Sequence, residues 1–512
     1  MTRYLLVVSV LTLAAYAATP PQAAQSVTAG SVVVEGQRID YTATAGTVIL
    51  KNQQGEPTGS MFYVAYTRNG VTEESHRPVT FFYNGGPGSS SIWLHMGAFG
   101  PQRIATSDHA HTPPAPYQLV NNDYSLLDAT DEVFIDAMST GYSRILRKAE
   151  GGAGTPKDFY GIDPDVRSFA QFITSYLSRN NRWNSPKYLY GESYGTVRSE
   201  VLANYLEQVD DIDPNGVILQ SAYTGGGIFG SDLAYETDLP TMAAVAWYHH
   251  KLPNQPAHLR PLLAQVEQFA LNQYAEALNA GNSMSPTAFD AIAEKLHEYT
   301  GLDTAFIEKA NLRITEGEFR HDVLGDQGMV VGDLDGRFTG PQMDPLSLGA
   351  SYDPQSASIS SAYVTGFNAY MHNVLKYGRG QTYRPEAYDI VTGWSRTDRN
   401  LMTRQNRSNP GIDLAQAMKY NPELRVEVDA GYFDLNLPYD GMVYSVNHLS
   451  LPKDLQSHIQ FKFYRSGHMI YVNIPALKEL HDNTAAFIRS TSAQPSPGAG
   501  GAAGGAAAPA RE

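Results

Sequence analysis

Apolar residues occur in short runs along the chain, and the spacing between these runs changes near residue 78. Before that point the runs are close together and separated by turns that contain glycine, which is typical of antiparallel strands. Beyond it, the runs are far enough apart for a helix between them, which is typical of parallel strands. Strands are predicted at residues 31–35, 39–45, 47–50 and 61–67, and then at residues 79–83, 132–135, 187–190, 217–220, 425–428 and 459–464.

Helices are predicted between several of the later strands. Residues 166–177 and 196–209 carry apolar side chains at the spacing of one helix face. Alternating strands and helices predict an α/β fold with a central, mostly parallel sheet that helices cover on both faces. We therefore expect the α/β-hydrolase fold, with an antiparallel strand region at its N-terminal end.

The alternation stops after residue 220 and resumes with a predicted helix at 412–420. Helical patterns at 261–278 and 288–299 predict that the segment between residue 220 and this helix contains an inserted helical cap.

The last residues are mostly Ala, Gly and Pro and cannot bury an apolar surface, so we expect a disordered tail. The expected organisation is a signal peptide at 1–17, a linker at 18–30, a hydrolase core at 31–224 and 401–490, a cap at 225–400 and a tail at 491–512.

The first 17 residues have the features of a secretory signal peptide. Arg3 supplies a positive charge, residues 4–14 are apolar, and Ala15-Tyr16-Ala17 resembles a cleavage site. The apolar run is too short for a membrane anchor, and no later run approaches the length of a membrane-spanning helix. We expect an exported protein of bacterial origin, secreted or periplasmic, without a membrane span.

Composition narrows the class of protein further. With 512 residues and 42% hydrophobic content, the chain can form a large core, which excludes a disordered protein. The net charge of −15 argues against a nucleic-acid partner, which would favour a basic surface. The chain has no cysteine, so disulfides and thiolate metal sites are excluded and the core must supply the stability.

A serine lies between two glycines directly after the strand predicted at 187–190, in Gly191-Glu192-Ser193-Tyr194-Gly195. This is the G-x-S-x-G pattern of a nucleophile elbow, in which a sharp turn between a strand and a helix exposes the serine. The glycines avoid collisions between the strand and the helix. The alternative is an ordinary glycine-rich turn, but the predicted strand and helix favour the elbow.

A serine nucleophile requires a histidine base and a carboxylate that orients the histidine. His468 follows the last predicted strand on a loop that contains glycine, near the C-terminus. Asp434 lies in the loop after the strand at 425–428 and completes the order serine, acid, histidine of α/β hydrolases. Asp429 and Asp440 are the competing acids, one at the end of the strand and one beyond a proline.

A tetrahedral intermediate requires two N–H donors for its oxyanion. The loop Asn84-Gly85-Gly86-Pro87-Gly88 follows the strand at 79–83 and is placed to supply one donor. The amide of Tyr194, next to the nucleophile, is placed to supply the other. Taken in isolation, the glycine-rich loop would be interpreted as a β-turn.

Taken together, these motifs resemble the serine carboxypeptidase family in order and in spacing. The resemblance covers about residues 77–488 without most of the cap, and the first loop together with the elbow is a specific pair. The motifs are Asn84-Gly85-Gly86-Pro87-Gly88-Ser89-Ser90-Ser91 ending at Gly100-Pro101, Phe134-Ile135-Asp136 leading to Gly141-Tyr142-Ser143, Gly191-Glu192-Ser193-Tyr194-Gly195 and Gly467-His468-Met469.

The resemblance implies roles for individual residues. It implies a catalytic triad of Ser193, Asp434 and His468, and an oxyanion hole to which Gly86 contributes. It also implies a site for the terminal carboxylate of the substrate, formed by Asn84, Gly85 and Glu192. No cofactor or metal is implied, and the expected partner is a peptide with a free C-terminus.

The chain departs from the family pattern at three places. Ala98 occupies a position where many members have a second glutamate that pairs with the one before the serine. Ser89 occupies a position where many members have a cysteine. The acid lies in Gly-Tyr-Phe-Asp, where members have Gly-Asp-x-Asp. The absence of the second glutamate puts a strict preference for a free C-terminus in question.

Glu192 next to a substrate carboxylate must be protonated, because two negative charges would repel. Its pKa should therefore be raised, and peptidase activity should favour acid pH. The alternative is that Glu192 makes a structural hydrogen bond within the elbow. Asp333-Leu334-Asp335-Gly336-Arg337 begins like a calcium loop, but its glycine is fourth and its fifth residue is arginine, so we expect no metal there.

The sequence thus predicts an exported serine carboxypeptidase-like hydrolase that acts through an acyl-enzyme. An esterase or acyltransferase could use the same triad, because the fold does not determine the acyl group. A noncatalytic binding protein on the same fold is a third hypothesis, against which the complete triad argues.

Overall fold

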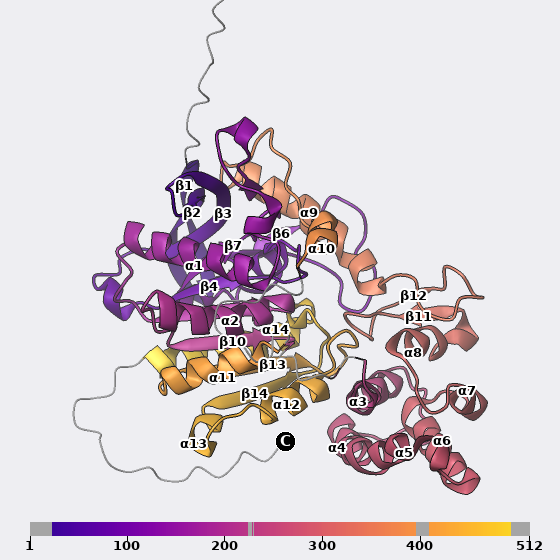
Figure 1. Cartoon of the computed structure of the whole chain (residues 1–512). Helices are drawn as coiled ribbons and strands as arrows, with labels where there is room; N and C mark the ends of the chain where they lie inside the picture. Colours follow the sequence, from indigo (N-terminus) through magenta and orange to yellow (C-terminus); the bar gives the residue numbers. More distant parts are fainter. Residues whose placement is uncertain (1–22, 224–227, 229, 396–408, 493–512) are drawn as a thin grey trace, which may run out of the picture.

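The structure is a computed structural model that describes residues 23–223, 228, 230–395 and 409–492. Within these residues, ten strands form one sheet in the order β1-β2-β3-β7-β4-β9-β10-β13-β14, with β8 paired to β3 (Figure 1). The strands are β1 (Gln25–Val34), β2 (Gln37–Lys51), β3 (Pro57–Arg68), β4 (Val79–Tyr83), β7 (Asp131–Ile135), β8 (Arg144–Ile145), β9 (Lys187–Glu192), β10 (Gly216–Gln220), β13 (Arg425–Gly431) and β14 (Ile459–Tyr464).

The sheet is antiparallel at its N-terminal end and parallel elsewhere. Strands β1, β2, β3 and β7 pair antiparallel, and from β7 through β4, β9, β10 and β13 to β14 all pairs are parallel. This confirms the predicted architecture. Two short antiparallel pairs lie outside this sheet: β5 (Gln102–Ile104) with β6 (Leu119–Asn121), and β11 (Met329–Val331) with β12 (Thr339–Pro341).

Two strand predictions near the N-terminus were wrong in detail. The strands expected at 39–45 and 47–50 are one strand, β2, because Gly46 stays paired with Gln25 on one side and Tyr63 on the other. A side chain at Gly46 would lie 2.9 Å from the carbonyl oxygen of Ala24, so glycine allows close strand approach here and makes no turn. Strand β1 begins at Gln25, inside the expected linker.

Helices cover both faces of the sheet. In β4, Val79, Phe81 and Tyr83 point to one face and Phe82 to the other, and both sets are buried. The first face is covered by α1 (Ile162–Arg179), α2 (Tyr194–Val209) and α11 (Gly411–Tyr420), and the second by α9 (Pro354–Asn373) and α14 (Ile474–Ser492). The predicted helices at 166–177, 196–209 and 412–420 are confirmed.

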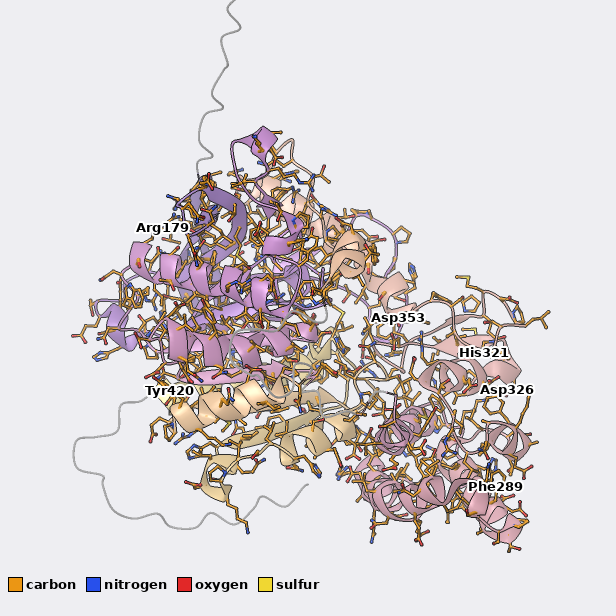
Figure 2. All side chains as sticks on the ribbon, viewed as in Figure 1. Arg179, Phe289, His321, Asp326, Asp353 and Tyr420 are labelled. Atoms are coloured by element: carbon orange, nitrogen blue, oxygen red, sulfur yellow. The ribbon has the colours of Figure 1, made fainter. Side chains whose placement is uncertain are left out.

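Residues 232–327, which follow β10 in the chain, form a helical lobe beside the sheet, which Phe289, His321 and Asp326 mark in Figure 2. Its helices are α3 (Asp232–Tyr248), α4 (Leu259–Phe269), α5 (Ala275–Ala280), α6 (Pro286–Thr300), α7 (Thr304–Lys309) and α8 (Glu316–Asp322). Helix α3 contacts α12 (Tyr439–Asn447) of the core. The helical nature predicted for 261–278 and 288–299 is confirmed, although a π-helical turn separates α4 from α5.

The later part of the expected cap belongs to the core. Helix α9 packs against the second face of the sheet, and its Phe367 and Tyr370 lie in the same apolar cluster as Phe82. Helix α10 (Tyr388–Gly393) follows it, and α13 (Lys453–Gln456) precedes β14. The lobe is therefore shorter than the predicted segment 225–400.

The two ends of the chain fall partly outside the described residues. The expected signal peptide at 1–17 lies there, as does the part of the expected tail from residue 493. Thr491 and Ser492, which were counted with the tail, are helical and end α14. In the part of the chain that the structure describes, no helix has the length and apolar character needed to cross a membrane.

Candidate active site

Ser193 lies in a sharp turn between β9 and α2. Its φ of 62° and ψ of −130° place it in a conformation that serine rarely adopts. A Cβ atom on Gly191 would lie 2.2 Å from the carbonyl oxygen of Gly195, and one on Gly195 would lie 2.7 Å from the carbonyl oxygen of Tyr83. Both glycines are therefore sterically required, and the predicted strand, turn and helix around Ser193 are confirmed.

The loops after β9, β13 and β14 meet at one edge of the sheet, because these strands are parallel and β10 alone lies between β9 and β13. Asp434 follows β13 and His468 follows β14. Nδ1 of His468 lies 2.8 Å from Oδ2 of Asp434, and both side chains are buried. Since the carboxylate accepts this hydrogen bond, Nδ1 carries a proton and Nε2 is the ring nitrogen left to act as a base.

The competing acids lie elsewhere. Asp429 is inside β13 and accepts a hydrogen bond from the hydroxyl of Tyr464 at 2.7 Å. Asp440 lies in the first turn of α12. The second carboxylate oxygen of Asp434 accepts a hydrogen bond from the amide of Leu437 at 2.9 Å. Of the three candidates, Asp434 is therefore the acid that the structure brings to His468.

The hydrogen bond to Asp434 changes the pKa of His468. Burial by itself lowers the pKa of the imidazole, but the Asp434 carboxylate more than offsets this effect and raises the pKa to about 9. The backbone carbonyl of His468 accepts hydrogen bonds from the Ser221 hydroxyl at 2.8 Å and from the Gln220 amide at 3.2 Å. Gln220 is the last residue of β10 and Ser221 follows it, so the central strands hold the histidine loop in place.

Glu192 precedes Ser193 and is buried. Burial raises the pKa of its carboxyl group to about 7, although the nearby charge of His468 acts in the opposite direction. The hydroxyl of Tyr471 donates to Oε1 at 3.3 Å, and the amide of Gln220 donates to Oε2 at 3.1 Å. Neither partner of Glu192 was predicted from the sequence. The position of Gln220 at the carboxyl end of the neighbouring strand β10 could have indicated that it lies beside Glu192.

The loop at 84–88 packs directly against the elbow. A Cβ atom on Gly85 would lie 2.3 Å from the amide nitrogen of Tyr194, and Gly86 has a φ of +104°, which favours glycine. The Asn84 side-chain oxygen accepts a hydrogen bond from the amide of Leu94 at 3.1 Å. Tyr194 is the first residue of α2, so its amide lies at the N-terminus of the helix.

Arg198 ties this loop to the elbow. It lies in α2, and its guanidinium group donates to the carbonyl oxygen of Asn84 at 2.9 Å and to Asp165 at 2.7 Å. Both charged side chains of the pair are buried. Sequence reasoning missed Arg198, because its partners lie far away along the chain.

The departures from the family pattern have structural counterparts. Ala98 is buried in a π-helical turn, η2 (Leu94–Phe99), and a Cβ atom on its neighbour Gly97 would lie 2.6 Å from the Tyr471 ring. The hydroxyl of Ser89 donates to Glu386 at 2.8 Å, and burial raises the pKa of that carboxyl group to about 7.

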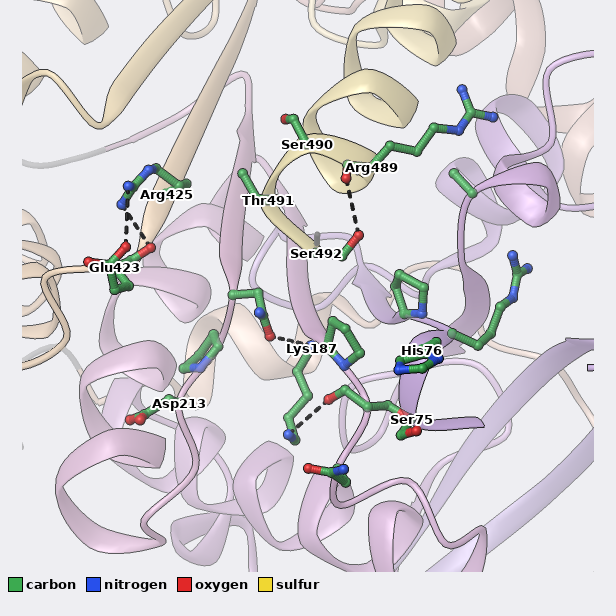
Figure 3. A pocket seen from close by; sticks show the side chains of 18 of the residues that line it. Ser75, His76, Lys187, Asp213, Glu423, Arg425, Arg489, Ser490, Thr491 and Ser492 are labelled. Carbon is green, nitrogen blue, oxygen red and sulfur yellow. Dashed lines mark hydrogen bonds and ion pairs between the residues drawn. The ribbon is translucent and has the colours of Figure 1, made fainter. Parts of the chain in front are cut away.

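A separate hollow of about 1090 Å³ lies at the opposite edge of the sheet (Figure 3). It is lined by Lys187 at the start of β9, Arg425 at the start of β13, and Arg489 to Ser492 at the end of α14. The predicted site residues do not line it. Among the described residues, no group of three or more His, Asp or Glu side chains is arranged to hold a metal ion.

Comparisons with known proteins bear on the fold and the family. A model of the family described as serine carboxypeptidase matches residues 36–458, which include Ser193 and Asp434 and end before His468. The structure of Kex1(delta)p, a prohormone-processing carboxypeptidase from Saccharomyces cerevisiae, is similar with a TM-score of 0.54 and 15% identity over 88% of this chain and 91% of that chain. A carboxyl esterase from Bacillus coagulans has a TM-score of 0.35 and 12% identity over 87% of this chain and 98% of that chain.

Proposed function

The chain belongs to the serine carboxypeptidase family, and we propose that it releases residues from the free C-terminus of peptides through an acyl-enzyme on Ser193. The enzyme is a serine-type carboxypeptidase and thus a hydrolase. The observation that carries the mechanism is the 2.8 Å contact between His468 and Asp434 at the sheet edge where the Ser193 elbow lies.

In the proposed mechanism, Nε2 of His468 takes the proton of the Ser193 hydroxyl as the serine attacks the peptide carbonyl. Asp434 keeps the imidazole in the required tautomer and stabilises its cationic form. The amides of Gly86 and Tyr194 stabilise the oxyanion. His468 then protonates the leaving amine, and water releases the acyl group by the same steps in reverse order.

We propose that Asn84, Gly85 and Glu192 bind the terminal carboxylate of the substrate. Glu192 can donate a hydrogen bond to a carboxylate only while it is protonated, and its pKa of about 7 makes this possible at mildly acid pH. His468 must instead be neutral to act as a base, and its raised pKa means that it is protonated, and therefore inactive as a base, at low pH. The pH optimum for peptides should therefore lie below the optimum for esters that lack a carboxylate.

The discriminating experiment compares three matched substrates: a peptide with a free C-terminus, its C-terminal amide and a simple ester with the same acyl group. A carboxypeptidase should hydrolyse the free acid with a much larger kcat/KM than the amide. Equal hydrolysis of acid and amide would support the alternative, a broader esterase or acyltransferase, which the alanine at position 98 favours. No labelling of Ser193 by a fluorophosphonate probe would support a noncatalytic binding protein.

We also propose that residues 1–17 direct export and are removed. N-terminal sequencing of the protein isolated from the periplasm or the culture medium tests this. A mature protein that retains residues 1–17, or one found only inside the cytoplasm, would contradict it.

A further inference from the structure

We propose that residues 333–337, Asp-Leu-Asp-Gly-Arg, form a clasp that positions both the acid loop and the histidine loop of the active site. The clasp lies between β11 and β12, at the border between the helical lobe and the core. This inference rests on the proposed triad of Ser193, Asp434 and His468. Within the clasp, Asp335 and Arg337 are the positioning residues.

The backbone of the clasp holds the loop that carries Asp434. The carbonyl oxygen of Asp333 accepts hydrogen bonds from the amides of Leu435 and Asn436, both at 3.1 Å. The amide of Gly336 donates to the carbonyl oxygen of Phe433 at 2.9 Å. The residues on both sides of the acid are thus bonded to the clasp.

The same segment holds the loop that carries His468. The amide of His468 donates to the carbonyl oxygen of Leu334 at 2.6 Å, and the amide of Gly467 donates to Oδ2 of Asp335 at 3.1 Å. A Cβ atom on Gly467 would lie 2.3 Å from the Leu334 oxygen, so the two segments are in close contact. One short segment is therefore bonded to both of the loops whose side chains form the His468–Asp434 hydrogen bond.

A buried ion pair holds the clasp in this shape. The guanidinium group of Arg337 lies 2.6 Å from Asp335, and the two side chains are 4% and 0% exposed. Arg337 also reaches the hydroxyl of Ser466 at 3.2 Å and the carboxylate of Asp108 at 3.1 Å. The segment begins like a calcium loop, but its Asp335 carboxylate forms an ion pair with Arg337.

Two contacts anchor the clasp to surrounding helices. The amide of Asp333 donates to Asp353 at 2.8 Å, and Asp353 also caps the start of α9 on the core (Figure 2). The carbonyl oxygen of Gly336 lies 2.7 Å from Nε2 of His249, which follows α3 of the lobe. The clasp therefore connects the lobe, α9 and the triad loops, and a change in it should alter the geometry of the triad and leave the substrate-binding loop in place.

The test uses the full-length enzyme and compares Arg337→Gln, Arg337→Lys and Asp335→Asn with wild type on the ester and on the peptide acid. Loss of the ion pair should lower kcat ~10- to 100-fold with little change in KM, since displacement of a catalytic group by about 1 Å has effects of this size. Arg337→Lys should recover part of kcat, because it restores the positive charge. The downfield NMR signal of the proton on Nδ1 of His468 should shift or broaden in Arg337→Gln.

Arg313→Gln is the matched control. Arg313 also forms an ion pair in the lobe, with Asp232 at 2.7 Å, but it does not touch the clasp. The control should lose stability without loss of kcat or change in the downfield signal. If Arg337→Gln does not fold, Asp335→Asn answers the same question, because asparagine keeps an acceptor for the Gly467 amide and removes the charge that Arg337 needs.

The outcomes separate the clasp from the proposed function. If wild-type enzyme is not labelled by a fluorophosphonate probe, the proposed triad fails. If wild type is labelled and folded Arg337→Gln or Asp335→Asn keeps the wild-type kcat and downfield signal, the clasp hypothesis is wrong. Equal loss of kcat in Arg313→Gln would also overturn it, since the effect would then reflect general stability.

Discussion

Ser193 has a positive φ, and the close contacts around Gly191 and Gly195 impose this conformation on it. Alanine has the same Cβ atom, so Ser193→Ala should fold with an unchanged melting temperature. It should lose labelling by a fluorophosphonate probe and lower kcat by about a thousandfold or more, because it has no nucleophile. Steady-state kinetics and calorimetry check both parts, and robust turnover by the variant would remove Ser193 from the mechanism.

Asp434 and Asp429 are both buried carboxyl groups near the last two strands, which makes them a matched pair. Asp434→Asn should lower kcat/KM by roughly a thousandfold or more, because asparagine does not hold the tautomer of His468 that the reaction needs. Asp429→Asn should have a far smaller effect, since Asp429 bonds to Tyr464. A larger loss of kcat/KM in Asp429→Asn would reassign the acid.

Glu192 should control the alkaline limb of peptide hydrolysis. Its pKa is raised to about 7 by burial, so the ratio of kcat/KM for the peptide to kcat/KM for the ester should show an alkaline limb, which falls as the pH rises through that region and the carboxyl group ionises. Glu192→Gln keeps a hydrogen-bond donor but does not ionise, so it should flatten this limb. The kcat/KM for the ester should follow the ionisation of His468 alone in both enzymes, so the ester serves as the reference.

Asn84→Ala is the companion variant for the same pH series. It should raise KM for the peptide acid and leave the ester almost unchanged, because it removes carboxylate binding and keeps the nucleophile. Equal losses on both substrates, together with unchanged alkaline limbs in Glu192→Gln, would mean that both residues have structural roles.

At the scale of elements, the segment before α10 is attached to the loop that follows Gly86. The amide of Ser90 donates to the carbonyl oxygen of Pro385 at 2.9 Å, that of Ala387 donates to Gly88 at 2.8 Å, and Glu386 accepts the hydroxyl of Ser89. The carboxyl group of Glu386 is buried here, and burial disfavours its ionised form although the hydrogen bond from Ser89 favours it.

The stability of that attachment should depend on pH. Burial raises the pKa of Glu386 from 4.5 to about 7 in the folded protein. Its contribution to stability is therefore fully present below about pH 4.5 and is lost as the pH rises to about 7. Glu386→Gln does not ionise, so the melting temperature of the variant relative to wild type should increase across this window. If the difference between the two melting temperatures stays constant from about pH 4.5 to about pH 8, the proposed contribution of Glu386 to stability is wrong.

At the scale of the whole molecule, one apolar cluster runs from the sheet into the lobe. It contains Phe81 of the sheet and Leu202 of α2 as well as Leu263 and Ile307 of the lobe. We expect a single cooperative unfolding transition, because the lobe and the core share this buried surface.

Tryptophan fluorescence can test this cooperativity. Trp93 lies in the core and Trp247 in α3 of the lobe. Variants that each retain one of these two tryptophans should show the same melting midpoint, equal to that from far-UV circular dichroism. An earlier transition reported by Trp247 would show that the lobe unfolds independently.

Most elements of the sheet and the immediate surroundings of Ser193 could be predicted from the sequence. Strand runs, helix periodicity and the glycines of the elbow depend on backbone conformation and on neighbours close in sequence, which a local pattern reveals. The chain order of serine, acid and histidine also narrowed the choice of Asp434 and His468. Gly46 was misjudged because glycine favours turns and equally permits close strand approach.

The contacts between segments that are distant in sequence became apparent only in the folded structure. The partner of Glu192 is Tyr471, 279 residues away, and α9 covers the core sheet although it follows the lobe in sequence. The clasp at 333–337 bonds to loops about a hundred residues further on, with a 132-residue separation between Asp335 and Gly467. Local patterns contain no record of such pairings, because they arise from the packing of complete elements and the hydrogen-bonding demands of buried loops.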